Sequence, residues 1–284
     1  MAKLSFVTKY IFVLLLFHLL SFSVYAKALS NKLKVVSTSL ASDEIIFSLL
    51  ERSSRKESFD IYYSYIAYNQ DYSNISDLIP KEKIFHINKE SLFIKDPDII
   101  FLSPYNKAEF LDSVSSYSHA KAYIISPSST LDELLSNITL IGEALDLTGE
   151  ATFITRHILT SLESVKSRLS LKQISVLTYM PHNITISSYT LLDDLLSRLG
   201  IHSISKDSIG YASLDEEKVF LGDKPDYIIF INANYSDQII DFELENSYLK
   251  RIKISKDKLI YISEKLAFCT SNFIVDLIEI FGSL

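Results

Sequence analysis

Apolar residues recur every three or four positions through the middle of the chain, from Thr130 to Ser170. This spacing predicts two consecutive amphipathic helices. Thr130 and Glu133 have the form of a capping box, so the first helix should begin there. We expect it to end near Asp146, with Gly149 suited to the left-handed position after a helix end. A second helix of about 20 residues should follow, long enough to act as a rigid connector.

On both sides of this helix pair, short apolar runs alternate with amphipathic segments. Before the pair, the pattern predicts strands at 33–37, 96–103 and 122–125, and helices at 42–50 and 108–116. After the pair, it predicts strands at 174–178, 224–232 and 259–262, and helices at 191–199 and 273–281. Alternating strands and helices are typical of α/β folds with parallel sheets.

We therefore predict an α/β fold with two doubly wound lobes, each built on a central sheet and joined by a long rigid helix. The first lobe should cover residues 31–146, the connecting helix 149–170 and the second lobe 174–284. A chain of 284 residues exceeds one ordinary domain, which agrees with this division.

Two segments far apart in the chain are nearly the same. Residues 96–103 read DPDIIFLS and residues 224–232 read KPDYIIFIN. A tyrosine and a predicted helix follow each segment, Tyr105 in the first case and Tyr235 in the second. The two lobes therefore look like diverged copies of one unit.

The first 26 residues have the pattern of a secretory signal peptide. Lys3 and Lys9 precede or open an apolar run at 10–22, and small residues follow at 23–26. The run is shorter than the roughly 20 apolar residues that a membrane-spanning helix needs. We expect cleavage near Ala26 and a periplasmic protein. Cleavage would remove two lysines and no acidic residue, which makes the formal net charge of −7 more negative by two.

Composition excludes several functional classes. The acidic net charge disfavours nucleic-acid binding. The chain has only 6 glycines, and neither G-x-G-x-x-G nor a Walker motif occurs, which argues against phosphate-binding loops. Cys269 is the only cysteine, so no internal disulfide can form, and we interpret it as a small buried apolar residue.

Several motifs occur in a characteristic order. A Ser-x-Ser loop at Ser37 and Ser39 leads into a helix that carries Glu44, and the Pro-Asp strand follows a short helix. The helix pair, the segment LDDLLSRLG at 192–200, the second Pro-Asp strand and a closing strand and helix come next. In this order the chain resembles the periplasmic substrate-binding proteins of ABC importers for vitamin B12, iron-siderophores and haem, the class with a helical backbone between its lobes.

The resemblance implies a ligand between the lobes, contacted by loops at the carboxyl ends of strands. On this basis the predicted ligand-binding residues are Ser37, Ser39, Tyr68, His86, Tyr105, Tyr189, Tyr211 and Phe268. Aromatic walls suit a large planar or chelated ligand, because rings supply contact area at a low entropic cost. Unlike most members of this family, the chain has no tryptophan, and His86 stands where a glycine is common.

The resemblance also implies an inner-membrane ABC permease as partner, met by one acidic residue on each lobe. The matching position in the first lobe is Glu109, and in the second lobe Asp237 or Asp241. Carboxylates pair well with the fork-like guanidinium groups of arginine, which suits such a contact. We expect a monomer with a small-molecule chelate as ligand.

Other functions remain open from the sequence alone. An exported hydrolase is one, although no G-x-S-x-G, Ser-His-Asp or H-E-x-x-H pattern occurs, and we interpret the pair Asp193 and Asp194 as a solvated helix start. A sensor or scaffold on the same fold is another. The histidines are scattered, so we predict no metal site, no catalytic residue and no resident cofactor, while one His or Tyr could ligate haem iron.

Overall fold

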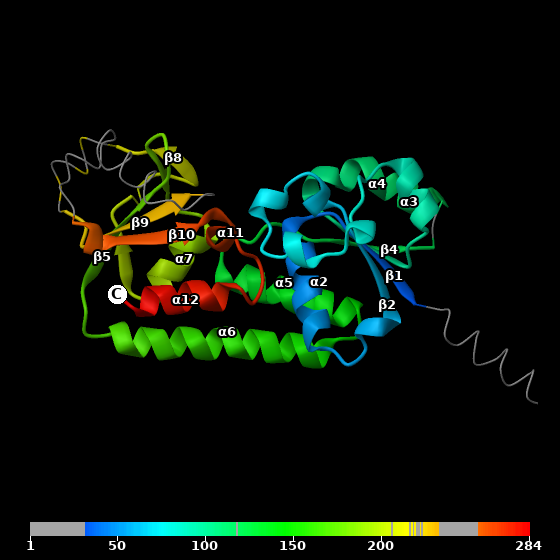
Figure 1. The fold of residues 1–284 in the computed structure, drawn as a ribbon, viewed down its shortest axis with the longest axis horizontal. Helices are drawn as coiled ribbons and strands as arrows, with labels where there is room; N and C mark the ends of the chain where they lie inside the picture. The colour runs from blue at the N-terminus through cyan, green and yellow to red at the C-terminus, as the bar shows by residue number, and fades with distance from the viewer. Residues whose placement is uncertain are drawn as a thin grey trace, which may run out of the picture.

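The computed structural model describes residues 32–117, 119–205, 207–215, 217, 219, 222, 224–232 and 255–284. Figure 1 shows two α/β lobes side by side, with one long helix running along both of them. The predicted signal peptide at 1–26 and the two second-lobe acids, Asp237 and Asp241, lie outside the described residues.

The first lobe contains a four-stranded parallel sheet in the order β2-β1-β3-β4. Its strands are β1 (Leu33–Ser37), β2 (Phe59–Tyr63), β3 (Ile99–Leu102) and β4 (Lys121–Ile124). The helices around it are α2 (Leu40–Arg52), α3 (Lys89–Lys95) and α4 (Pro104–Tyr117). Short 3₁₀ turns connect β2 to α3.

The second lobe repeats this topology. Its sheet has the order β10-β9-β5-β7, so in both lobes the first strand lies between the second and the third. The strands are β5 (Ile174–Tyr179), β7 (Ile201–Ser203), β9 (Tyr227–Asn232) and β10 (Leu259–Ser263), all parallel. A small antiparallel pair, β6 (Ile184–Ile186) and β8 (Tyr211–Ser213), is specific to this lobe. Its helices are α7 (Leu191–Arg198), α11 (Glu264–Ala267) and α12 (Ile274–Gly282).

The aspartate of each Pro-Asp segment has the same structural task in both lobes. The Asp98 carboxylate accepts a 2.8 Å hydrogen bond from the backbone N–H of Lys34, in the first strand of its sheet. The Asp226 carboxylate accepts a 2.8 Å bond from the backbone N–H of Ser175 at the matching position. These bonds from Ser175 lower the pKa of Asp226. The repeated sequence thus encodes a repeated tie between the first and third strands.

Alternation along β3 builds a three-layer lobe. Ile99 and Phe101 belong to the large core shared with the α2 and α5 side, whereas Ile100 and Leu102 pack with Phe110 of α4 on the other face. Because successive strand residues face opposite sides, an uninterrupted apolar strand needs cover on both faces. All four residues are buried, which explains the continuous apolar run in the sequence.

The central helices are α5 (Leu131–Ala144) and α6 (Thr148–Leu169). Helix α6 packs against α2 from the first lobe and α12 from the second, so it supports both. Gly142 lets α5 and α6 approach closely, since a β-carbon there would lie 2.4 Å from the Ala151 β-carbon. The capping box at Thr130 is confirmed: its side chain accepts from the Glu133 backbone N–H at 3.2 Å.

The prediction of a left-handed glycine between these helices was wrong. Asp146 takes that conformation, with φ of 56°, and Gly149 lies inside the first turn of α6. The backbone N–H of Leu147 donates to the Gly142 carbonyl at 2.7 Å, and that of Asp146 to the Glu143 carbonyl at 3.2 Å. This is the bond pattern of a Schellman motif, in which a short polar residue can replace glycine.

Other boundaries also differ from the sequence prediction. Helix α4 begins at Pro104, because proline fits the first helical position, so Tyr105 is helical and not in a loop. Helix α2 begins at Leu40, capped by Ser39. The prediction did not include strands β2, β6, β7 and β8, of which three have only three residues each.

Candidate ligand-binding cleft

A cavity of about 400 Å³ lies between the two lobes. Its volume falls within the range of about 300 to 1,000 Å³ that is usual for ligand pockets. The first lobe contributes Thr38, Ser39, Leu40, Ala41, Tyr65, Ser103, Tyr105, Pro127, Ser128 and Ser129. The second lobe contributes Ile186, Tyr189, Thr190, Leu191, Leu192, Tyr211, Ala267, Phe268, Cys269 and Thr270.

The first-lobe lining comes from the carboxyl ends of parallel strands. Thr38 follows β1, Tyr65 follows β2, Ser103 follows β3 and Pro127 follows β4. In open α/β sheets this edge is where loops converge and ligands bind. The geometry of the sheet therefore places the cavity where a ligand is expected.

Five of the eight predicted ligand-binding residues line this cavity: Ser39, Tyr105, Tyr189, Tyr211 and Phe268. Their role in ligand binding stays a prediction. The Tyr211 and Phe268 rings lie 5.7 Å apart, and Tyr72 of the first lobe lies 6.3 Å from Phe268. An aromatic cluster thus bridges the lobes beside the cavity.

Three predicted residues do not line the cavity. Ser37 is fully buried at the end of β1 and bonds within the first lobe. Tyr68 and His86 form an edge-to-face pair, with ring centroids 4.7 Å apart. Tyr68 is 58% exposed, so this pair lies on the surface of the first lobe.

Sequence reasoning identified only Ser39 and Tyr105 among the ten first-lobe residues that line the cavity. Tyr65 is one of five tyrosines between residues 62 and 72, and no sequence pattern distinguishes it from the other four. The segment Pro127 to Ser129 directly follows the predicted strand at 122–125, so the rule of carboxyl strand ends could have identified it.

Ser37 belongs to a buried polar cluster under the cavity floor. Its hydroxyl donates to the Asp43 carboxyl and lies 2.6 Å from the Ser42 hydroxyl. Asp43 is fully buried, and burial raises its pKa well above the ordinary value. The Ser-x-Ser pattern is therefore structural here: Ser37 holds Asp43, and Ser39 caps α2.

We expect the unfolding free energy to fall with rising pH because of Asp43. Above the pKa that Asp43 has in the unfolded chain, near 4, the unfolded chain has lost a proton that the folded protein still holds. The free energy of unfolding therefore falls by about 1.4 kcal/mol per pH unit until the pKa of Asp43 in the folded protein is reached. Urea unfolding of Asp43→Asn between pH 4 and 6 should show a flatter pH dependence. Glu51→Gln, an exposed carboxyl on the same helix, is the control. Equal slopes for Asp43→Asn and the wild type would contradict this assignment.

Glu44, the next residue of α2, joins the two lobes. One carboxylate oxygen accepts from the backbone N–H and side-chain amide of Asn74, at 3.0 and 2.8 Å. The other accepts from the backbone N–H and hydroxyl of Thr270 in the second lobe, at 2.8 and 3.1 Å. The Asn74 amide also donates to the Lys265 carbonyl of α11 at 2.8 Å. Burial raises the pKa of Glu44.

A second tie connects α7 to the start of α5. The Asp194 carboxylate accepts from the backbone N–H of Leu131 at 2.8 Å and from Arg198 at 2.7 Å. Arg198 also donates to Asp132 at 2.8 Å. Our interpretation of Asp194 as a solvated residue was therefore wrong, because its carboxylate holds two elements together.

Tyr189 has a strained backbone at the cavity wall. Its φ is 64°, a left-handed value that is unfavourable for a bulky residue. Hydrogen bonds of 2.8 Å fix the chain before it, from Ser187 N–H to the Gly210 carbonyl and from Gly210 N–H to the Ser188 carbonyl. Thr190 then caps α7. Strain held in place in this way is typical of functional positions.

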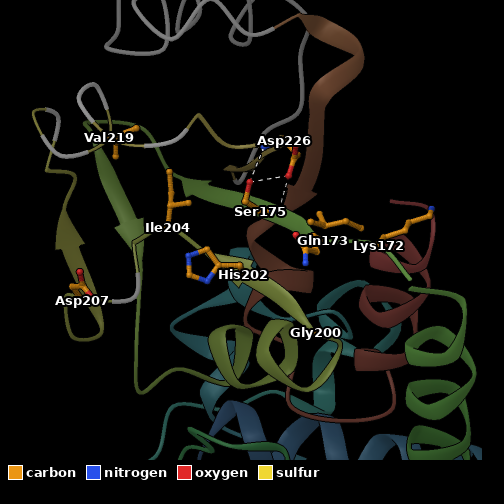
Figure 2. A pocket seen from close by; sticks show the side chains of 11 residues that line it. Lys172, Gln173, Ser175, Gly200, His202, Ile204, Asp207, Val219 and Asp226 are labelled. Carbon is orange, nitrogen blue, oxygen red and sulfur yellow. Dashed lines mark hydrogen bonds between the residues drawn. The ribbon is translucent and has the colours of Figure 1, made fainter. Parts of the chain in front are cut away.

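A larger cavity, of about 610 Å³, lies at the opposite edge of the second-lobe sheet (Figure 2). Its walls come mainly from the segments that precede β5, β7 and β9, including Gln173, Gly200 and Asp226, and also from Ile204 and Asp207 after β7. In this cavity the Asp226 carboxylate accepts a 2.8 Å hydrogen bond from the Ser175 hydroxyl, as Figure 2 shows. Because this cavity lies at the amino ends of the strands and in one lobe only, we assign the candidate site to the cleft between the lobes.

The described part of the chain contains no group of three or more His, Cys, Asp or Glu side chains arranged to hold a metal ion. Within the same residues, no helix has both the length and the apolar character needed to cross a bilayer.

Comparison with known sequences identifies the family. Residues 35–262, most of the chain, match the family described as periplasmic binding protein. The chain belongs to this family. No curated protein matches the sequence.

Solved structures of periplasmic binding proteins share the fold. The haem-binding protein HutB of Vibrio cholerae is 15% identical with a TM-score of 0.68, covering 88% of this chain and 98% of that one. The petrobactin-binding protein YclQ of Bacillus subtilis is 15% identical with a TM-score of 0.67, covering 89% and 92%. The vitamin B12 binding protein BtuF of Vibrio cholerae is 16% identical with a TM-score of 0.61, covering 89% and 96%. The predicted two-lobed α/β fold of the helical-backbone class is thus confirmed.

Proposed function

We propose that this protein is the periplasmic substrate-binding component of an ABC importer. It captures an iron-siderophore, haem or cobalamin-like ligand between its lobes and delivers it to an inner-membrane permease. The observation that carries this proposal is the cavity between the lobes, which both lobes line with aromatic side chains. Vitamin B12, haem and petrobactin, the ligands named for the three proteins above, are large molecules, which agrees with such walls.

The position of Glu109 supports a docking role. Glu109 is exposed and lies four residues after Tyr105 on α4. Residues four apart share one face of a helix, so Glu109 lies one turn beyond a cavity residue that is itself 89% exposed. A permease that covers the mouth of the cleft would meet this carboxylate. The second-lobe counterpart stays a prediction for Asp237 or Asp241.

Charge reversal at Glu109 should abolish delivery and leave ligand binding intact. Glu109→Lys would place an ammonium group against the arginines expected on the permease, whereas the cavity itself is unchanged. Transport into vesicles containing the permease, together with ligand affinity in solution, measures both effects. Glu90→Lys, at an exposed position on α3, is the matched control. Undiminished transport by Glu109→Lys would show that docking does not use this residue.

A further inference from the structure

The cleft carries no formal charge on the walls that the structure describes. Among the described residues that line it, none is Asp, Glu, Lys, Arg or His. Two acidic residues of α2, Asp43 and Glu44, are fully buried beneath the wall, and Glu44 has four hydrogen bonds of its own. Asp194, near Leu192 of the wall, is bonded to Leu131 and Arg198. A charged ligand would therefore find no opposite charge on these walls.

Most hydroxyl groups of the wall already serve the fold. Thr38 donates to the Phe101 carbonyl at 2.9 Å, and Thr190 donates to the Ser187 carbonyl at 2.8 Å. The other lining hydroxyls engaged within the protein are those of Ser39, Ser103, Ser128 and Thr270. Thr38 and Thr190 donate their O–H groups to backbone carbonyls, whereas Ser103 and Ser128 accept in these bonds and can still donate.

Four phenols are the largest hydrogen-bonding groups on the wall that the described fold does not use. Tyr65, Tyr105, Tyr189 and Tyr211 all line the cavity, and none of their hydroxyls bonds to another described residue. Burial raises the pKa of Tyr65, and partial desolvation raises that of Tyr211 to about 12. These two phenols are therefore neutral at pH 7, able to donate to or accept from a polar ligand without adding charge.

The strained backbone at Tyr189 is an independent sign that the wall is shaped for a ligand. A φ of 64° costs stability for a tyrosine, and it holds a ring that is 76% exposed beside the cavity. The formal net charge of −7 adds a repulsive long-range field for anions. Moving an ion from water into a site without an opposite charge has a desolvation cost that no charge on the described wall offsets.

We infer that the cleft binds a metal chelate without net charge, whose amide, hydroxamate or hydroxyl oxygens meet the four phenols. This inference rests on the proposed function and narrows it. Ferric trihydroxamates and cyanocobalamin are uncharged chelates of this kind. Ferric tris-catecholates carry three negative charges, and haem carries two propionates, so both would need cations that the described wall lacks.

The test is a titration of the full mature chain with a ferric trihydroxamate, cyanocobalamin, a ferric tris-catecholate and haem. Tyrosine fluorescence reports the binding of each. We expect the ferric trihydroxamate or cyanocobalamin to bind at least about tenfold more tightly than the catecholate or haem. Which of the two uncharged chelates binds more tightly shows whether the ligand is a siderophore or a cobalamin. Tightest binding of an anionic chelate would overturn the inference and leave the proposed function standing. Binding of no chelate would overturn both.

A charge placed in the cleft provides a reciprocal test. Tyr105→Arg adds a guanidinium group at a position that is 89% exposed, so the fold should tolerate it. It should raise the affinity for the ferric tris-catecholate by about tenfold or more and lower the affinity for the uncharged chelate. Phe93→Arg adds the same charge on α3, at a 68% exposed position outside the cleft, and is the matched control. Equal effects of the two variants would contradict a role for charge in the cleft.

Discussion

Glu44→Ala should lower the free energy of unfolding by about 3 kcal/mol, because it removes four hydrogen bonds and leaves donors from both lobes without a partner. Asn74 and Thr270 would each lose two bonds, and the side chain that joins them would be gone. The loss should also loosen the segment that carries Phe268, two residues before Thr270 in the cavity wall. Urea unfolding monitored by circular dichroism measures the first effect.

The matched control for Glu44 is Glu51→Ala on the same helix. Glu51 is partly exposed and pairs with Lys56, so its removal should change the unfolding free energy by less than about 1 kcal/mol. If the two variants lost the same small amount, the carboxylate of Glu44 would not be a structural tie between the lobes.

Removing the two most exposed tyrosines of the cleft should weaken ligand binding by about tenfold or more, which corresponds to about 1.4 kcal/mol. Tyr105 is 89% exposed and Tyr189 76%. Both rings can therefore contact a ligand, and they contribute little packing to the fold. The double variant Tyr105→Ala with Tyr189→Gly is preferable to two alanines, because glycine adopts the left-handed backbone of position 189 without strain.

Thermal unfolding separates this prediction from a packing role. Truncating a buried aromatic residue costs about 3 to 5 kcal/mol, whereas the double variant should unfold near the wild-type midpoint. Phe93→Ala, at an exposed ring on α3, should change neither affinity nor stability. A large fall of the midpoint with unchanged affinity per folded molecule would show that the two tyrosines support the fold instead of the ligand.

The sequence predicted those elements whose signals are long and local. The capping box at Thr130 marks the start of α5, and the periodic spacing marks the length of α6. The duplicated Pro-Asp segment indicated two similar lobes, and the structure adds the reason, since Asp98 and Asp226 tie the first and third strands of their sheets. These features depend on residues close in sequence or on a repeated pattern.

Short strands and tertiary ties were not predictable in the same way. Strand β7 has only three residues, too few for a period to emerge. Asp194 looked like an ordinary helix start, yet its partner Leu131 lies 63 positions away in sequence. Glu44 likewise finds Thr270 only in the folded chain. No local pattern distinguishes such a carboxylate from a solvated one.

The candidate cleft shows the same division. Aromatic residues that follow predicted strands could be predicted as cleft residues from their position alone, as for Tyr105 and Phe268. Ser37 was nominated by the same rule, but its side chain turns into the buried cluster with Asp43. The direction of a side chain at a strand end depends on packing beneath it, which the sequence does not display.

The most direct test of the central claim, that the cleft between the lobes captures a chelate for import, is equilibrium binding to the purified mature chain. Tyrosine fluorescence should be titrated with a ferric trihydroxamate, a ferric tris-catecholate, haem and cyanocobalamin, for the wild type and for the Tyr105→Ala, Tyr189→Gly variant, with bare Fe³⁺ and Zn²⁺ as controls. We predict saturable binding of at least one chelate, weakened by about tenfold or more in the variant, and no matching response to the bare metals. Binding of no chelate, or equal binding by the wild type and the variant, would contradict it.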